Sequence, residues 1–380
     1  MNGSPTQGGG VPMGALLARL TRGITQSHIE HLSPVPARGA PAAVRHVYRR
    51  LEREFGLLAP PVTLHAASPP VLAACWLMLR EALLVDGLVR RDTKEAVAAA
   101  VSLANRCPYC VDVHGSALRG LLRGPDARAL VDDRLTEVAE PRLRAIVEWF
   151  RHDGTPAGAV LPPRVDPAEI PELIGVAVLF HYLNRMVNVF LAPSPLPVAM
   201  TPRAARVARW LAAVTMARLA RRGVAPGADL DLLPPAPLPP DLGWARPNAS
   251  LTTAFARASA AVDDAAERVV PASVRGLLLD LLAGPAGLRA VTDRAGLEAS
   301  LETLPKSDRA GGRLALTAAF FSYRVTDAMV AGNRLGGCDD RRLLELVSWA
   351  SLTAARAAGR QLQAAWQGAP GAVPPRERRG

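Results

Sequence analysis

The chain has 380 residues, enough for two ordinary domains, and 49% of them are hydrophobic while 4% are aromatic. This composition argues against a disordered chain, and the abundance of Ala and Leu favours an all-α fold over a large β-sandwich. The formal charge is +11, but only Lys94 and Lys306 among the 45 basic residues are lysines. This ratio, with scattered arginines and few aromatic residues, indicates codon bias, so we expect no nucleic-acid partner.

No signal peptide is visible at the N-terminus, and the longest uncharged apolar run, residues 173–183, is too short to cross a bilayer. We therefore expect a cytoplasmic protein without a membrane partner. A structural disulfide is unusual in that compartment, so a close pair among the four cysteines points to catalysis or metal binding.

The elements follow in chain order. Residues 1–40 are rich in Gly, Pro and Ser and predict a loosely ordered arm. Apolar residues then recur at helical intervals, with Pro and capping residues at the helix starts. They predict helices over 44–55, 68–83, 92–104, 107–122, 172–191 and 203–222. A Pro-rich linker is expected over 225–248, between a first domain at 41–224 and a second at 249–366, with a flexible tail at 367–380.

The second domain looks like a degenerate copy of the first. A shift of 216 residues places Ser68–Gly120 on Gly284–Gly336 without a gap and matches several Pro, Leu, Asp and Gly residues. The same shift sets Gly311, Tyr323, Thr326 and Val330 opposite Glu95, Cys107, Cys110 and His114, respectively. The copy would therefore keep the helices and lack the reactive groups.

Cys107, Cys110 and His114 form the most informative cluster. On a helix they fall within about 60° of one another, so both thiols and the imidazole share one face. Cys107 fits the N-cap position, with Pro108 in the first turn. The positive helix end and the nearby imidazole predict a lowered thiol pKa, as a nucleophilic cysteine requires.

Three other interpretations of the cluster compete. Cys-Pro-Tyr-Cys resembles the glutaredoxin motif, but here a helical stretch precedes it. A zinc site lacks a nearby fourth ligand. Two buried cysteines and a core histidine are the structural alternative. Cys75 and Cys338 lie alone on apolar stretches, and we expect both to be core residues.

Two histidine groups outside the cluster are weaker candidates. His181, Asn184 and Arg185 share a helix face and either line the site or form a buried polar trio that locks helix packing. His28 and His31 in the arm are weak candidates for a metal.

The spacing of Glu95, Cys107, Cys110 and His114 resembles the core pattern of the alkylhydroperoxidase D-like branch of the carboxymuconolactone decarboxylase family. The segments Phe55–Pro61 and Phe180–Arg185 also look like that family. The resemblance covers residues 40–195 well and 250–365 faintly. The decarboxylase branch lacks the cysteine pair, so a lyase is the less favoured alternative.

The resemblance implies an all-α fold and thiol-dependent peroxide reduction, with Cys110 attacking, Cys107 resolving the sulfenic acid, and His114 and Glu95 relaying the proton. It implies no cofactor or metal. The partners would be a peroxide and a thiol or dithiol reductant, such as a lipoyl or thioredoxin-like protein. Well-known members carry a His where this chain has Tyr109.

Two questions stay open at this point. One is whether the disulfide turns over, because a redox-responsive scaffold that oxidises once is a further alternative. The other is the assembly: we expect that the second copy covers faces that single-repeat relatives bury, so any homo-oligomer should be smaller than theirs.

Overall fold

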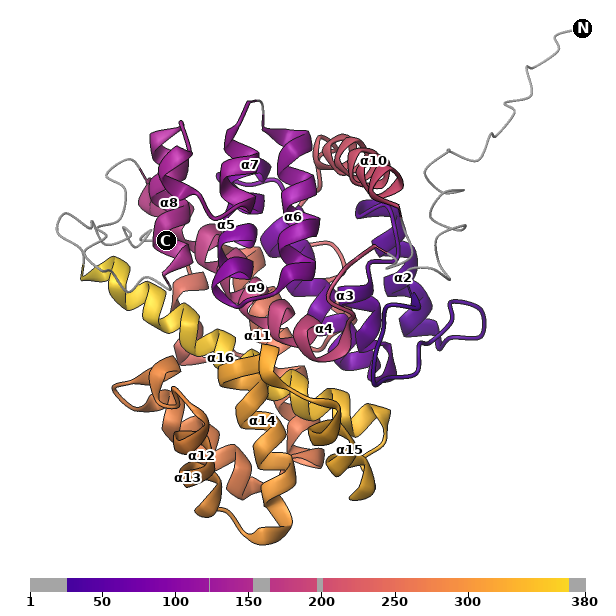
Figure 1. The fold of residues 1–380 in the computed structure, drawn as a ribbon, viewed down its shortest axis with the longest axis vertical. Coiled ribbons are helices and arrows are strands. Elements are labelled where there is room, and N and C mark those ends of the chain that lie inside the picture. The colour runs from indigo at the N-terminus through magenta and orange to yellow at the C-terminus, as the bar shows by residue number, and fades with distance from the viewer. Residues whose placement is uncertain (1–25, 123, 153–164, 197–200, 369–380) are drawn as a thin grey trace, which may run out of the picture.

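The computed structural model describes residues 26–122, 124–152, 165–196 and 201–368. Within these ranges the chain is helical, and its extended pairing is limited to one bridge between Ile29 and Leu191. The all-α expectation is therefore confirmed (Figure 1). All six expected helices are present, with boundaries that differ by a few residues.

The helices divide at the Pro-rich segment into two groups. The first group comprises α2 (Ala42–Glu54), α3 (Pro60–Thr63), α4 (Pro69–Leu79), α5 (Arg91–Ala104), α6 (Pro108–Leu121), α7 (Asp126–Val131), α8 (Pro141–Arg151), α9 (Ile170–Phe190) and α10 (Pro202–Ala220). The second comprises α11 (Ala249–Val269), α12 (Ala272–Ala283), α13 (Arg294–Glu302), α14 (Arg309–Phe321), α15 (Asp327–Leu335) and α16 (Asp340–Gln367). The helix that contains α4 does not stop at Leu79 but continues as a π-helical turn, Arg80–Leu84.

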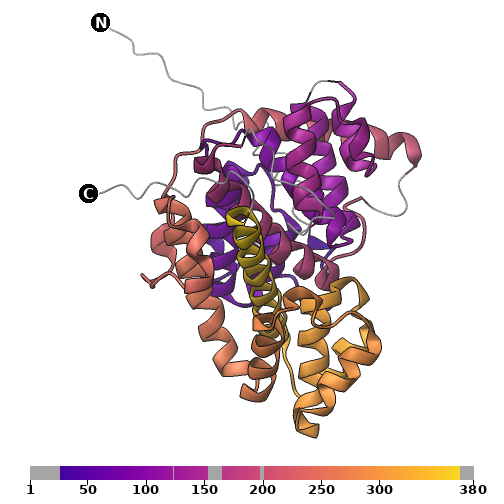
Figure 2. The ribbon, with the colours of Figure 1, turned by 90° about the vertical axis from the view of Figure 1, so that its left-hand side faces the viewer.

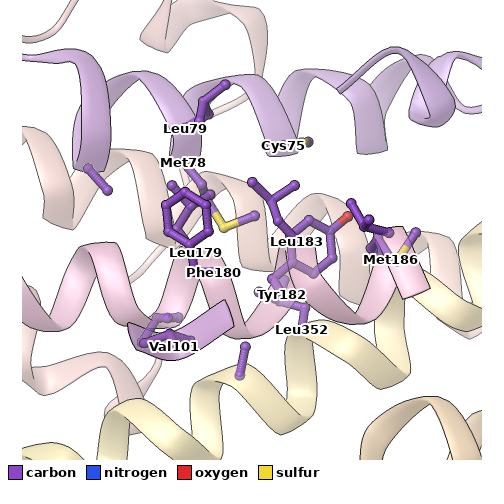
Figure 3. Close-up of a cluster of buried hydrophobic side chains, with 14 of the residues drawn as sticks. Cys75, Met78, Leu79, Val101, Leu179, Phe180, Tyr182, Leu183, Met186 and Leu352 are labelled. Atoms are coloured by element: carbon purple, nitrogen blue, oxygen red, sulfur yellow. The ribbon is translucent and has the colours of Figure 1, made fainter. Parts of the chain in front are cut away.

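The two groups meet along paired long helices. α9 packs along α16, and α4 packs along α11. In Figure 1, α16 runs through the middle of the molecule, with α5 to α8 on one side and α12 to α15 on the other. Figure 3 shows the contact from within: side chains of α4 and α9 face each other, and Leu352 of α16 lies on the other side of α9. One continuous apolar core therefore spans both groups.

α9 is buried along nearly its whole length because neighbouring helices surround it. The helical stretch Pro167–Phe190 is long and apolar enough to cross a membrane by length and composition, because it extends the uncharged run 173–183 past charged residues on both sides. However, 94% of its most apolar window is buried inside the protein. The stretch serves as a core helix in this structure.

Helices lie at corresponding positions over part of the predicted alignment of the two copies. A shift of 216 carries α5 (91–104) onto 307–320 and α6 (108–121) onto 324–337, where α14 and α15 lie. It fails for α4 (69–79), because 285–295 contains only a short 3₁₀ turn and the start of α13. The packing corresponds as well: α5 packs against α6 and α9, and α14 packs against α15 and α16.

Two segments differ from their expected character. Residues 26–40 pack against the first group: Glu30 N–H donates to the Phe190 carbonyl, and Leu32 is buried. The Pro-rich segment 225–248 is not a loose spacer, because it buries Leu242 and Trp244 against α16 and α11. Apolar side chains between the prolines account for this packing. Residues 1–25 of the expected arm and 369–380 of the expected tail lie outside the described residues.

Candidate functional site

A tight turn between α5 and α6 places the two cysteines. Ser102 accepts a hydrogen bond from the Cys107 N–H at 2.9 Å, and Arg106 takes a left-handed conformation with φ of 51°. Cys107 is the N-cap residue of α6 and Pro108 follows in its first turn, as the sequence predicts. The turn makes α5 and α6 packed neighbours, and both helices contact α9.

Glu95 of α5 lies against His114 of α6. The distance between Glu95 Oε2 and His114 Nδ1 is 2.6 Å, and both side chains are buried. Arg91 donates to the other carboxylate oxygen, Oε1, at 2.8 Å. Burial alone would raise the pKa of Glu95, but the positive charge of Arg91 and the contact with His114 hold it at about 2. Glu95 is therefore ionised at neutral pH, and a carboxylate on Nδ1 favours the histidine tautomer with a basic Nε2.

The Cys110 thiol is more deeply buried than a reactive cysteine usually is. Burial, followed by hydrogen bonding with Cys107, raises its pKa well above the usual value, although a hydrogen bond with Asn184 acts in the opposite direction. The expected lowering of this pKa is therefore wrong for the dithiol state. The helix end and the imidazole are present, but desolvation of the thiolate outweighs them.

Cys110 and His114 open onto one cavity of about 240 Å³. Its other walls are mostly apolar and come from α4, α9, α10 and the segment before α3; they include Phe55, Leu57, Leu79, Leu83, Phe180 and Met216. Phe180 also packs edge-on against the His114 ring, with 4.5 Å between the ring centroids. Figure 3 shows the Phe180 ring extending from α9 toward α4, next to Met78. Cys107 is fully buried and does not line this cavity.

The polar residues His181, Asn184 and Arg185 of α9 lie near the cysteine motif, and Asn184 contacts Cys110. Asn184 donates to Ser102 Oγ at 3.0 Å and accepts from Asn105 Nδ2 at 3.1 Å. Arg185 donates to the carbonyls of His181 and Ala319, so this network ties α9 to α14. The sequence predicted that His181, Asn184 and Arg185 either line the site or lock helix packing. Asn184 does the first, because it contacts Cys110, and Arg185 does the second, because it hydrogen-bonds to α14.

The remaining candidates divide clearly. Cys75 is buried in the core as expected, and burial raises its pKa. Cys338 is only partly buried, so its expected core position was wrong. His28 lines the cavity, whereas His31 lies 3.6 Å from the Asp327 carboxylate. In the described part of the chain, no group of three or more His, Cys, Asp or Glu side chains could hold a metal ion.

Sequence reasoning missed Arg91, which clamps Glu95. The spacing of four residues between opposite charges on one helix is a readable signal for such a pair. Phe180 was noted only as part of a family-like segment, and no sequence signal places its ring on His114. Met216 of α10 also lines the cavity, although no sequence signal connects this helix with the site.

Comparison with known proteins finds a family model, a curated relative and a solved structure that are similar to this chain. The model of the carboxymuconolactone decarboxylase family matches residues 70–151. A Mycobacterium tuberculosis protein named alkyl hydroperoxide reductase is 36% identical over 90% of this chain and 96% of its own length. A solved structure titled as the alkylhydroperoxidase AhpD core of an uncharacterized peroxidase-related protein from Ralstonia eutropha is 21% identical, with a TM-score of 0.37. It covers 42% of this chain and 89% of its own.

Proposed function

Because the chain belongs to the carboxymuconolactone decarboxylase family, in its alkylhydroperoxidase D-like branch, we propose that it reduces organic hydroperoxides with the Cys107 and Cys110 pair. The observation that carries this proposal is the shared cavity. Cys110 and His114 are polar members of a mostly apolar wall, and the ionised Glu95 holds the imidazole from behind. A nucleophile, a base and an orienting carboxylate are thus assembled at one place.

In the first step the peroxide's alkyl group occupies the cavity and its O–O bond approaches Cys110. His114 takes the thiol proton, and the thiolate attacks the terminal peroxide oxygen. The O–O bond breaks, Cys110 becomes a sulfenic acid, and the leaving alkoxide takes the proton from His114 to become an alcohol. Since the resting thiol is neutral, this transfer to His114 must accompany peroxide binding.

In the second step Cys107 attacks the Cys110 sulfenic acid. A disulfide forms and one water leaves. Two features support these roles: Cys110 faces the cavity, and Cys107 is buried beside it within hydrogen-bonding reach. An external thiol then restores both cysteines. This chemistry needs reduced thiols at rest.

The cavity favours a peroxide with an apolar group over hydrogen peroxide, because its walls gain from covering hydrocarbon. Tyr109 also lines it and is itself buried, which raises the pKa of the phenol. The phenol stays protonated at neutral pH and is therefore not a general base here, unlike the histidine of well-known relatives.

Stopped-flow mixing with cumene hydroperoxide tests the proposal. We expect rapid loss of one thiol pair per chain and formation of one alcohol, with no reaction in Cys110→Ser. Cys75→Ser is the matched control and should react like the parent chain. With dithiothreitol present, many peroxides should be consumed per chain. A single stoichiometric oxidation would instead indicate a redox-responsive scaffold, and undiminished reactivity in Cys110→Ser would refute the assignment.

A further inference from the structure

A second hollow lies on the other side of the cysteine motif. It has a volume of about 240 Å³, and its lining includes Arg106, Pro108, Tyr109, Asn188 and Tyr323. Tyr109 lines both this hollow and the peroxide cavity, so its side chain stands between the two. Arg106 and Pro108 are the chain neighbours of Cys107. The hollow therefore lies against the Cys107 turn, whereas the peroxide cavity reaches Cys110.

The hollow is built jointly by both halves of the chain. The Arg106 guanidinium stacks on the Tyr323 ring at 4.7 Å from the ring centroid, and Arg324 lies 5.5 Å from the same ring. Asn188 donates to the Asn105 carbonyl at 3.1 Å and to Ser322 Oγ at 3.0 Å. These contacts hold Arg106 in its left-handed conformation, which a non-glycine residue adopts at a cost. Strain that surrounding contacts maintain is common at functional sites.

The hollow is cationic. No Asp or Glu is among its lining residues, and among the described residues no carboxylate forms an ion pair with Arg106 or Arg324. The α6 N-terminus beside it adds a positive partial charge. Arginine on an aromatic ring suits a planar carboxylate, which it can bind with two parallel hydrogen bonds.

We propose that this hollow admits the reductant, and that the reductant is a thiol carrying a carboxylate group. The inference rests on the proposed function, because it concerns the disulfide that peroxide reduction leaves behind. The peroxide cavity is mostly apolar and its lining includes Asp112, so it would not favour an anion. A separate cationic entrance lets reductant and peroxide approach the two sulfurs from opposite sides of Tyr109.

The reaction follows from this placement. A reductant thiolate attacks the Cys107 sulfur, the bond to Cys110 breaks, and Cys110 leaves as a thiolate that takes a proton from water by way of His114. A second reductant thiolate attacks the reductant sulfur of the mixed disulfide and releases Cys107 as a thiolate, which takes a proton from water. Two reductant thiols are thus oxidised to one disulfide while one protein disulfide is reduced. The Cys107 sulfur is buried in the dithiol state, so the Arg106 to Pro108 turn must shift to expose it.

The test compares two thiols of nearly the same shape, 3-mercaptopropionate and 3-mercaptopropionamide. The full-length chain is first oxidised with one equivalent of cumene hydroperoxide, and its disulfide is mapped. The return of free thiols is then timed with each reductant, and the rate is divided by its thiolate concentration. We expect the carboxylate thiol to react about five to ten times faster, with the preference falling at high salt.

Two variants locate the preference. Arg106→Asn removes the charge with a residue that tolerates positive φ, and it should abolish the preference by slowing the carboxylate thiol alone. Arg294→Gln changes an exposed arginine on α13 and should keep the preference. Equal rates in the parent chain, or a preference that survives Arg106→Asn, would overturn the inference. Failure to form the Cys107–Cys110 disulfide would instead refute the proposed function.

Discussion

The helix pair α5 and α6 and the pair α14 and α15 share a scaffold but not a chemistry. In the first pair, Glu95, Cys107, Cys110 and His114 gather at one cavity wall or directly behind it. The equivalent positions of the second pair hold Gly311, Tyr323, Thr326 and Val330. There Thr326 caps α15 by accepting from Met329 N–H, and Val330 is buried. Positions that we propose supply chemistry in the first pair serve capping and packing in the second.

The second copy nevertheless contributes to the site. Tyr323, aligned with Cys107, supports Arg106 in the turn before that cysteine. The Ala319 carbonyl of α14 accepts from Arg185, which belongs to the network around Asn184. The copy that lacks the reactive groups therefore holds the turn and the polar network of the copy that has them.

The largest expected effect on peroxide reactivity is at Cys110, compared with the aligned residue Thr326. Cys110→Ser should abolish thiol oxidation by cumene hydroperoxide, because a hydroxyl at this position has no accessible anion. Thr326→Ser keeps the helix cap and should leave the oxidation rate unchanged. Stopped-flow traces of both variants check the pair. A loss of reactivity in Thr326→Ser would show that the second copy takes part in the chemistry.

The second largest effect on the peroxide oxidation rate is expected at Glu95, compared with the aligned residue Gly311. Glu95→Gln keeps the size of the side chain but removes the charge that orients His114, and we expect peroxide oxidation to slow by roughly 10²-fold. Gly311→Ala is the matched change, since the added Cβ would meet its nearest atom, in Leu346, at 3.6 Å. It should leave the rate intact. Rates from the same stopped-flow assay decide the matter, and an equally fast Glu95→Gln would remove Glu95 from the relay.

A smaller effect concerns pH. Because burial raises the pKa of Cys110, alkylation of this thiol by iodoacetamide should keep rising through pH 9. Glu95 has a pKa of about 2, so it stays ionised between pH 5 and 8 and should add no step there. Peptide mapping by mass spectrometry, with the Cys107→Ser chain to isolate one thiol, measures the profile. A plateau reached below pH 7 would mean that Cys110 rests as a thiolate.

Protein stability gives the smallest effect. The pKa of Glu95 lies below the usual 4.5, so its ionised form stabilises the fold above pH 4.5, and this contribution is lost as the pH falls toward 2.

At neutral pH, Thr326→Ala removes a helix cap and should cost about 1 kcal/mol of unfolding free energy. Urea unfolding measures it, and the peroxide rate of the folded variant should not change. A slower rate would couple the α15 cap to the site.

The sequence predicts much of this molecule because periodicity and capping are local properties. The helices from α2 to α10 that were expected, the N-cap role of Cys107 and the grouping of Cys107, Cys110 and His114 all follow from spacing along the chain. Asn184 was predicted as a residue that either lines the site or locks packing, because it shares a helix face with His181 and Arg185.

The contact of Glu95 with His114 depends on how two helices pack, which local spacing does not contain. It becomes predictable only once the α5 to α6 turn is known to be tight, since residues at similar distances from such a turn become neighbours. The predicted lowering of the Cys110 pKa was wrong because burial of the thiol outweighs the helix end and the imidazole, and burial depends on packing that local spacing does not contain. The packing of the Pro-rich linker was not predictable for a similar reason. Its residues Leu242 and Trp244 pack on α16 and α11, which come later in the chain.

The central claim is that Cys110 attacks the peroxide and Cys107 resolves it. Treating the full-length chain with one equivalent of cumene hydroperoxide, blocking free thiols and mapping the disulfides by mass spectrometry tests it most directly. The account predicts one disulfide, Cys107 to Cys110, and one alcohol per chain, with Cys75 and Cys338 still reduced. A chain whose Cys110 remains free while peroxide is consumed, or a disulfide that involves Cys75 or Cys338 instead, would contradict it.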